Sequence, residues 1–135
     1  MNRLMIAAIA FFLLGGCAAQ LSEHKMNYLA SALTKVSASV DATARYKRST
    51  DSLDEAQLLR ASTDHDPELM KPFEGMTVLV KRIGRDSAVL VCQANAGKAL
   101  LEDTGCTAKM EVHRWRNSEV SRCEFTLDVQ QLCAR

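Results

Sequence analysis

Four cysteines near the C-terminus are the residues best suited to form covalent cross-links. They are Cys92, Cys106, Cys123 and Cys133, at successive spacings of 14, 17 and 10 residues. Structural zinc sites usually contain a closely spaced cysteine pair, which is missing here. An even number of cysteines in a small exported domain is instead typical of disulfides. We predict two disulfides among three possible pairings, and we favour Cys92–Cys106 with Cys123–Cys133 because each would close a short local loop.

The three histidines do not have the spacing of a shared metal site. Asp64-His65-Asp66 is the densest group of potential ligands, but side chains two positions apart diverge on a helix, and on a strand both point away from the residue between them. His24 and His113 are isolated in the sequence. The chain also lacks a nucleophile elbow, a phosphate loop, a zinc-protease motif and a dinucleotide fingerprint. We therefore predict no catalytic residue, no metal, no cofactor and no enzymatic activity.

A tryptophan flanked by arginines is the candidate for partner binding. Arg114, Trp115 and Arg116 are contiguous, and a hairpin turn would bring Arg122 near them. Tryptophan and arginine are enriched at the energetic centres of protein interfaces, and the same group also suits an anionic ligand. The competing interpretation is a solvated strand face whose tryptophan packs at the edge of the core.

Length and charge exclude several classes of protein. The chain has 135 residues, with 17 basic and 16 acidic side chains and a net charge of +1. That balance provides no long-range field to attract nucleic acid, so we expect no nucleic-acid partner. The length fits one ordinary domain, which excludes a large multidomain enzyme and a polytopic membrane protein.

The N-terminus has the pattern of an export signal. Arg3 precedes an uninterrupted apolar run from Leu4 to Leu14, followed by Gly15-Gly16-Cys17. As a helix this run of eleven residues would span about 16 Å, roughly half of the hydrocarbon core, so a transmembrane anchor is the poorer interpretation. The tetrapeptide Leu14-Gly15-Gly16-Cys17 resembles the lipobox of bacterial lipoproteins.

That resemblance implies a membrane anchor. Residues 1–16 would be a cleaved lipoprotein signal peptide, and Cys17 would carry a diacylglyceryl thioether and an N-acyl chain such as palmitate. Residues 17–20 would form the lipidated tether. By the sorting rule of enterobacterial lipoproteins, Ala18 after the cysteine implies the outer membrane, with the domain on its periplasmic face.

Helical patterns occupy residues 21–72. An apolar stripe at spacings of three and four predicts a helix that packs either on its own domain or on a partner; its members are Met26, Leu29, Leu33, Val36 and Val40. Ser52 with Glu55 is typical of a capping box that opens a second helix. Asp66 before Pro67 indicates one more turn, which we expect to end at Pro72.

Strand patterns occupy residues 73–135. Residues 77–82 and 87–93 flank Gly84-Arg85-Asp86, a hairpin signature, and turns are expected at 95–97, 103–105 and 116–118. Residues 108–113 and 122–129 alternate between apolar and polar types, as half-buried strands do. The predicted fold is α+β: N-terminal helices, then a small antiparallel sheet of four or five strands stapled by two disulfides, forming one globular domain with 21–72.

These features are compatible with two functions. The first is a non-enzymatic accessory or assembly factor for an envelope complex such as a secretion, pilus or conjugation apparatus; in outline the chain resembles secretin pilotin lipoproteins, without a diagnostic motif. The second is a binding inhibitor of a cell-wall hydrolase, or an exclusion or immunity lipoprotein, that places the Cys92–Cys106 segment into a partner's cleft.

Overall fold

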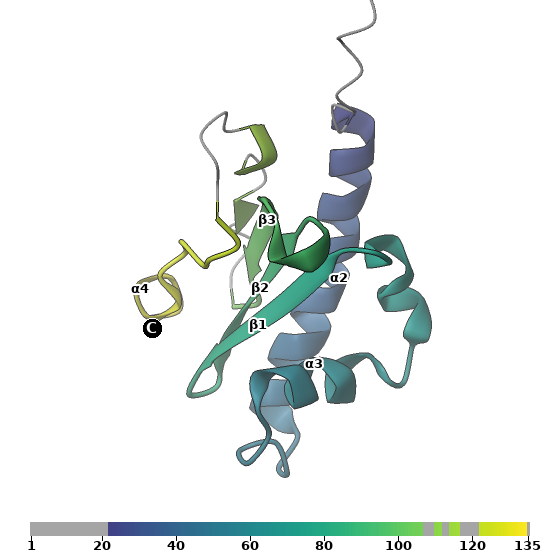
Figure 1. Cartoon of the computed structure of the whole chain (residues 1–135). Helices are drawn as coiled ribbons and strands as arrows, with labels where there is room; N and C mark the ends of the chain where they lie inside the picture. The colour runs from purple at the N-terminus through teal and green to yellow at the C-terminus, as the bar shows by residue number, and fades with distance from the viewer. Residues whose placement is uncertain (1–21, 107–109, 112–113, 117–121, 135) are drawn as a thin grey trace, which may run out of the picture.

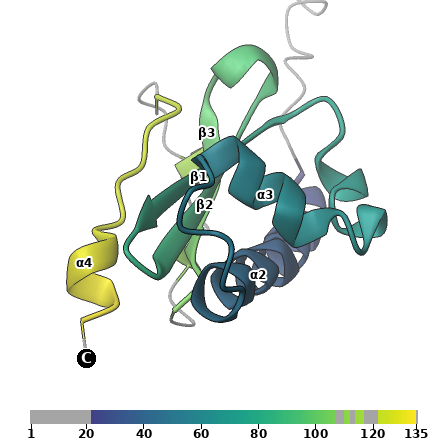
Figure 2. The ribbon, with the colours of Figure 1, turned by 90° about the horizontal axis from the view of Figure 1, so that it is seen from below.

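The fold is a helical layer and a C-terminal segment (residues 122–134) on opposite faces of one antiparallel sheet (Figures 1 and 2). The computed structural model describes residues 22–106, 110–111, 114–116 and 122–134. The sheet order is β1-β2-β3-β4, and the strands are β1 (Thr77–Ile83), β2 (Asp86–Cys92), β3 (Ala99–Thr104) and the two-residue β4 (Met110–Glu111). The predicted α+β class, with helices first and an antiparallel sheet after them, is confirmed.

Helix α2 (Glu23–Tyr46) provides most of the helical layer. Ser22 caps it by accepting a hydrogen bond from the Lys25 N–H, and Arg45 lies in its last turn, where a cation is favourable. Every member of the predicted apolar stripe is at most 1% exposed and packs in the main core with Val89, Val91 and Leu101 of the sheet. The stripe therefore serves the domain's own core, and its interpretation as a partner surface is wrong.

Helix α3 (Glu55–Thr63) begins two residues later than a cap at Ser52 would give. Its cap is Asp54, whose carboxylate accepts the Gln57 N–H while the Gln57 side chain accepts the Asp54 N–H. Ser52 with Glu55 and Asp54 with Gln57 both fit the capping-box pattern, so the sequence alone does not distinguish the two possible caps. Leu58 is fully buried against α2.

Two short 3₁₀ turns follow α3. Asp66 caps η1 (Pro67–Leu69) as predicted, with Pro67 in its first turn. Pro72 does not end the helical region, because it lies inside η2 (Lys71–Phe73) near its start, where a missing N–H costs no hydrogen bond.

The β1–β2 hairpin confirms the predicted pair of strands. Ile83 pairs with Asp86 across a two-residue turn in which Gly84 has a φ of +61°. The turn predicted at 95–97 is also present, as η3 (Ala94–Ala96). The turn predicted at 103–105 begins later, since Asp103 and Thr104 belong to β3. Gly105 follows against α2, where any Cβ would collide with Asp41.

The C-terminal segment lies across the face of the sheet opposite α2 (Figures 1 and 2). The strand predicted over 122–129 is absent: this stretch is irregular and leads into α4 (Val129–Leu132). Phe125 and Val129 pack on Ala88 and Leu90 of β2. Alternating apolar residues fit a segment lying on a sheet as well as a strand within it, which explains the error. Residues 110–111 of the strand predicted over 108–113 form β4, and the other residues of that range lie outside the described residues.

The four cysteines form two disulfides, as predicted, but the pairing differs from the one favoured. Cys92 is bonded to Cys123 and Cys106 to Cys133, with Cα–Cα distances of 5.7 Å in both. The favoured local pairing is wrong because Cys92 ends β2 on the face covered by the C-terminal segment. Each disulfide therefore joins the sheet region to that segment, across sequence separations of 31 and 27 residues.

Candidate functional site

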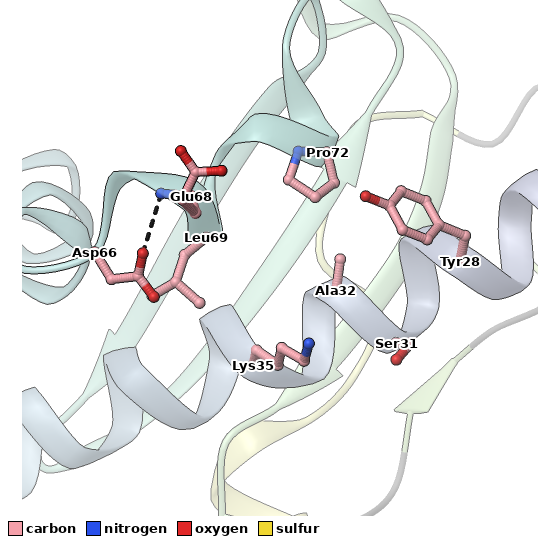
Figure 3. A pocket seen from close by; sticks show the side chains of 8 residues that line it. All are labelled: Tyr28, Ser31, Ala32, Lys35, Asp66, Glu68, Leu69 and Pro72. Atoms are coloured by element: carbon pink, nitrogen blue, oxygen red, sulfur yellow. Dashed lines mark hydrogen bonds between the residues drawn. The ribbon is translucent and has the colours of Figure 1, made fainter.

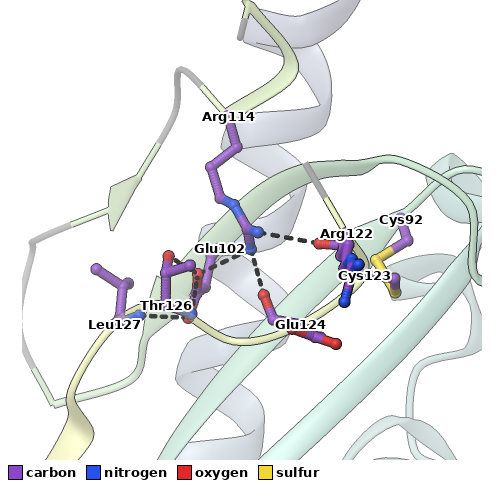
Figure 4. Close-up of polar contacts among 8 residues, drawn as sticks. All are labelled: Cys92, Glu102, Arg114, Arg122, Cys123, Glu124, Thr126 and Leu127. Carbon is purple, nitrogen blue, oxygen red and sulfur yellow. Dashed lines mark hydrogen bonds and ion pairs between the residues drawn. A yellow bond between two sulfur atoms is a disulfide. The ribbon is translucent and has the colours of Figure 1, made fainter. Parts of the chain in front are cut away.

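Arg114 of the predicted binding patch is a buried structural residue. It lies in η4 (Arg114–Arg116) and is 5% exposed. Its guanidinium forms an ion pair of 3.1 Å with Glu102 on β3, and donates hydrogen bonds to the main-chain carbonyls of Glu124 at 2.8 Å and Arg122 at 3.1 Å (Figure 4). At this degree of burial the Arg114 side chain is not accessible to a partner protein at the surface.

Glu102 is equally committed to internal contacts. It is fully buried, and besides Arg114 its carboxylate accepts the N–H groups of Thr126 and Leu127 at 2.9–3.1 Å and the Thr126 hydroxyl at 2.9 Å (Figure 4). A buried carboxylate is tolerated only with such partners. This cluster fastens the C-terminal segment to β3 beside the Cys92–Cys123 disulfide.

The rest of the predicted patch stays nearer the surface. Trp115 is half-buried against the main core, and the Arg116 guanidinium lies 5.2 Å from the centre of its ring. Arg116 also pairs with Glu23 at the start of α2, and Arg122 is exposed. The structure thus brings the four predicted residues together, but the tryptophan packs at the core edge and Arg114 points inward.

Asp103 is a second buried carboxylate beside α2. Burial raises the pKa of Asp103 to about 6, against opposing effects of the Ser37 hydroxyl and the Thr104 N–H. Ser37 Oγ nevertheless makes no formal hydrogen bond in the described structure. Asp103 and Ser37 lie in the packed layer between α2 and β3, where Asp103 is 4% and Ser37 1% exposed.

The histidines and the acidic triplet do not form a metal site in the described part of the chain. His24, Asp64 and His65 are exposed, and Asp66 is used as a helix cap. No group of three or more histidine, cysteine, aspartate or glutamate side chains in the described ranges is arranged to hold an ion. His113 lies outside the described residues.

A small pocket lies between α2 and the two 3₁₀ turns (Figure 3). Tyr28 and Lys35 line it from α2, and Glu68, Leu69 and Pro72 line it from the opposite side; its volume is about 230 Å³. Tyr28 is 59% exposed, and Glu68 already pairs with Lys71 on the surface. The lining contains one basic and two acidic side chains, of which Asp66 already caps a helix and Glu68 already pairs at the surface. The pocket therefore does not define a ligand.

A second groove lies at the outer edge of β1, and sequence reasoning missed it. It has a volume of about 590 Å³ and is lined by residues 78–81 of β1, by Ala56, Leu59 and Arg60 of α3, and by Phe125 of the C-terminal segment. Leu79 is 37% exposed there. The sequence contains no signal for this groove, because its walls come from three separate segments that only the tertiary fold brings together.

The segment between Cys92 and Cys106, which the inhibitor hypothesis uses as its inserted loop, divides into an exposed turn and a buried strand. Residues 93–96 are exposed, whereas residues 99–104 form β3, whose Leu100 and Leu101 are buried in the main core. The two cysteines are not bonded to each other, so no disulfide closes this segment into a local loop.

The described residues contain no helix with the length and apolar composition needed to cross a bilayer. Comparison of the chain with known protein families, characterised proteins and solved structures finds no match.

Proposed function

We propose that this chain is a lipid-anchored envelope protein that holds another protein and has no catalytic role of its own. In this proposal Cys17 carries the acyl chains, and the domain stands on the periplasmic face of the outer membrane as an accessory factor for an envelope assembly. The lipobox at residues 14–17 supports the anchor. The two disulfides support export, since such bonds persist in oxidising compartments.

The groove at β1 is the observation that supports a binding role. The buried charged groups Glu102 and Arg114 are consumed by internal contacts, whereas the β1 groove leaves apolar side chains accessible. Accessible apolar grooves on small proteins commonly bind other molecules. A protein-binding role uses this feature directly.

The geometry of the tether favours the same role. Five residues separate Cys17 from the start of α2 at Glu23, which limits the distance between them to roughly 20 Å. Helix α2 is 24 residues long, or about 36 Å, and α3 packs beside its C-terminal half, where Ser39 donates to the Ser62 carbonyl (Figure 1). The groove would therefore lie toward the end of the domain remote from the anchor.

A Cys17→Ser substitution tests the anchor. We expect this variant to lose labelling by a palmitate analogue and to leave the membrane fraction, because the thiol is the site of acylation. The parallel control is Cys106→Ser/Cys133→Ser, which removes two other thiols and should retain labelling. Labelling and membrane recovery of Cys17→Ser equal to those of the natural chain would overturn the proposal.

A further inference from the structure

The outer edge of β1 has main-chain groups directed away from the sheet. In the described part of the chain β1 pairs with β2 alone. Ile83 and Asp86 close a two-residue turn, so hydrogen-bonded pairs recur at every second residue from there. Leu79 and Lys81 thus bond β2, whereas Val78 and Val80 direct N–H and C=O outward.

A contact on the far side of β2 agrees with that alternation. Ser87 lies opposite Arg82, one of the residues that the alternation leaves unbonded to the neighbouring strand. The Ser87 carbonyl should therefore face away from β1, and it accepts the Gly105 N–H on the β3 side at 3.1 Å.

The open part of the edge is short. At the hairpin end of β1 the Arg82 guanidinium donates to the Thr50 carbonyl and pairs with Asp51, so the loop between α2 and α3 covers that end. Residues 78–81 remain, and these are the β1 residues that line the groove.

The walls beside this edge combine apolar surface with positive charge. On the α3 side Leu59 lies next to Arg60, and on the other side Leu79 and Phe125 lie near Lys81. Arg60 and Lys81 form no ion pair within the described ranges, and Glu55 is the one carboxylate among the lining residues. The groove therefore presents a hydrogen-bonding floor, two apolar walls and a net positive charge.

We propose that the edge of β1 binds an extended segment of a partner protein as an added strand. Main-chain groups of that segment would pair with Val78 and Val80, as in other cases of strand addition to a sheet edge. Its side chains would be apolar toward both walls and would include a carboxylate near Arg60 or Lys81, by charge complementarity. This inference rests on the proposed function for its assumption that the ligand is a protein.

Selection from a random peptide library displayed on phage tests this proposal. The processed chain, purified with both disulfides formed, is immobilised as the target. We expect enrichment of peptides that combine alternating apolar residues with acidic ones. An enriched peptide, synthesised and labelled, should bind in fluorescence anisotropy and should slow hydrogen exchange at the Val78 and Val80 amides.

Three variants locate the binding. Leu79→Asp should weaken the enriched peptide by about tenfold or more, since it places a charge against the apolar part of the groove. Lys81→Glu should weaken it less and shift a repeated selection toward basic peptides. Tyr46→Asp is the matched control: Tyr46 is 81% exposed at the end of α2 and outside the groove, and binding should be unchanged. Circular dichroism checks that each variant is folded.

Three results would overturn the inference. They are the absence of any enriched apolar-acidic peptide, binding unaffected by Leu79→Asp, and concentration-dependent dimerisation lost in Leu79→Asp without peptide binding, which would make a second copy the occupant. None of these results depends on acylation, so this failure is distinguishable from failure of the Cys17→Ser test.

Discussion

At the scale of single residues, the side chains with the most suggestive chemistry have structural roles. The run Arg114-Trp115-Arg116 predicts a surface patch, and Arg116 does lie near the surface. Arg114 is instead enclosed by Glu102 and the carbonyls of the C-terminal segment. Nothing local distinguishes the two arginines, because the partners of Arg114 lie 8 to 12 residues away along the chain.

The buried pair leads to a prediction about stability. Arg114→Ala leaves the fully buried Glu102 carboxylate without its cation, which should reduce the free energy of unfolding by about 3–5 kcal/mol. The matched control is Arg116→Ala, which removes an exposed pair with Glu23 and should cost about 1 kcal/mol or less. Urea denaturation followed by circular dichroism measures both. Equal losses in the two variants would contradict the assigned role of the buried pair.

At the scale of elements, the sequence pattern predicts those helices, caps and turns that are determined by interactions between residues close together in the chain. The stripe of α2, the cap at Asp66 and the Gly84 hairpin follow from side-chain spacing and turn geometry, and the structure contains all three. The segment 122–129 is not a strand, because burial against the sheet face gives the same alternation as strand pairing. The β1 groove has no sequence signal, since Phe125 reaches it from a different part of the chain.

The α2 stripe leads to a second prediction about stability. Leu33 is fully buried among core residues, so Leu33→Ala should cost about 2–5 kcal/mol and lower the melting temperature. Tyr28→Ala on the same helix removes a side chain that is 59% exposed and should cost about 0.5 kcal/mol or less. Thermal unfolding of the two variants compares them. A Leu33→Ala variant as stable as the natural chain would mean that the stripe is not part of the core.

At the scale of the whole molecule, the C-terminal segment is held on the sheet by covalent and ionic links together. Few of its residues are in regular secondary structure, so main-chain hydrogen bonding alone does not fix its position. Cys123 and Cys133 bond it at two points, and Glu102 binds it between them through Thr126 and Leu127. The sequence predicts that the four cysteines are oxidised, but the choice of partners depends on which face of β2 the segment covers.

The pairing can be tested on the intact chain without reduction. Trypsin cleaves after Lys and Arg, so Cys92 and Cys106 fall on the separate peptides 86–98 and 99–109, whereas Cys123 and Cys133 share the peptide 123–135. The pairing Cys92–Cys123 with Cys106–Cys133 should therefore link all three peptides into one species in mass spectrometry. Local pairing would instead give one linked pair and a separate, internally bridged 123–135.

A second protease separates the two crossed pairings. A glutamate-specific protease cleaves after Glu124 and so splits peptide 123–135 between its cysteines; it also cleaves after Glu102. We expect Cys123 to remain with peptide 86–98 and Cys133 with peptide 103–109. The two disulfides join cysteines that are 31 and 27 residues apart in the sequence. For loops of this length the chain-entropy model gives roughly 3–4 kcal/mol of stabilisation per disulfide. Cys106→Ser/Cys133→Ser should accordingly lower the urea midpoint. If the proteolytic fragments pair locally, the position of the C-terminal segment, and with it the Phe125 wall of the groove, would have to be revised.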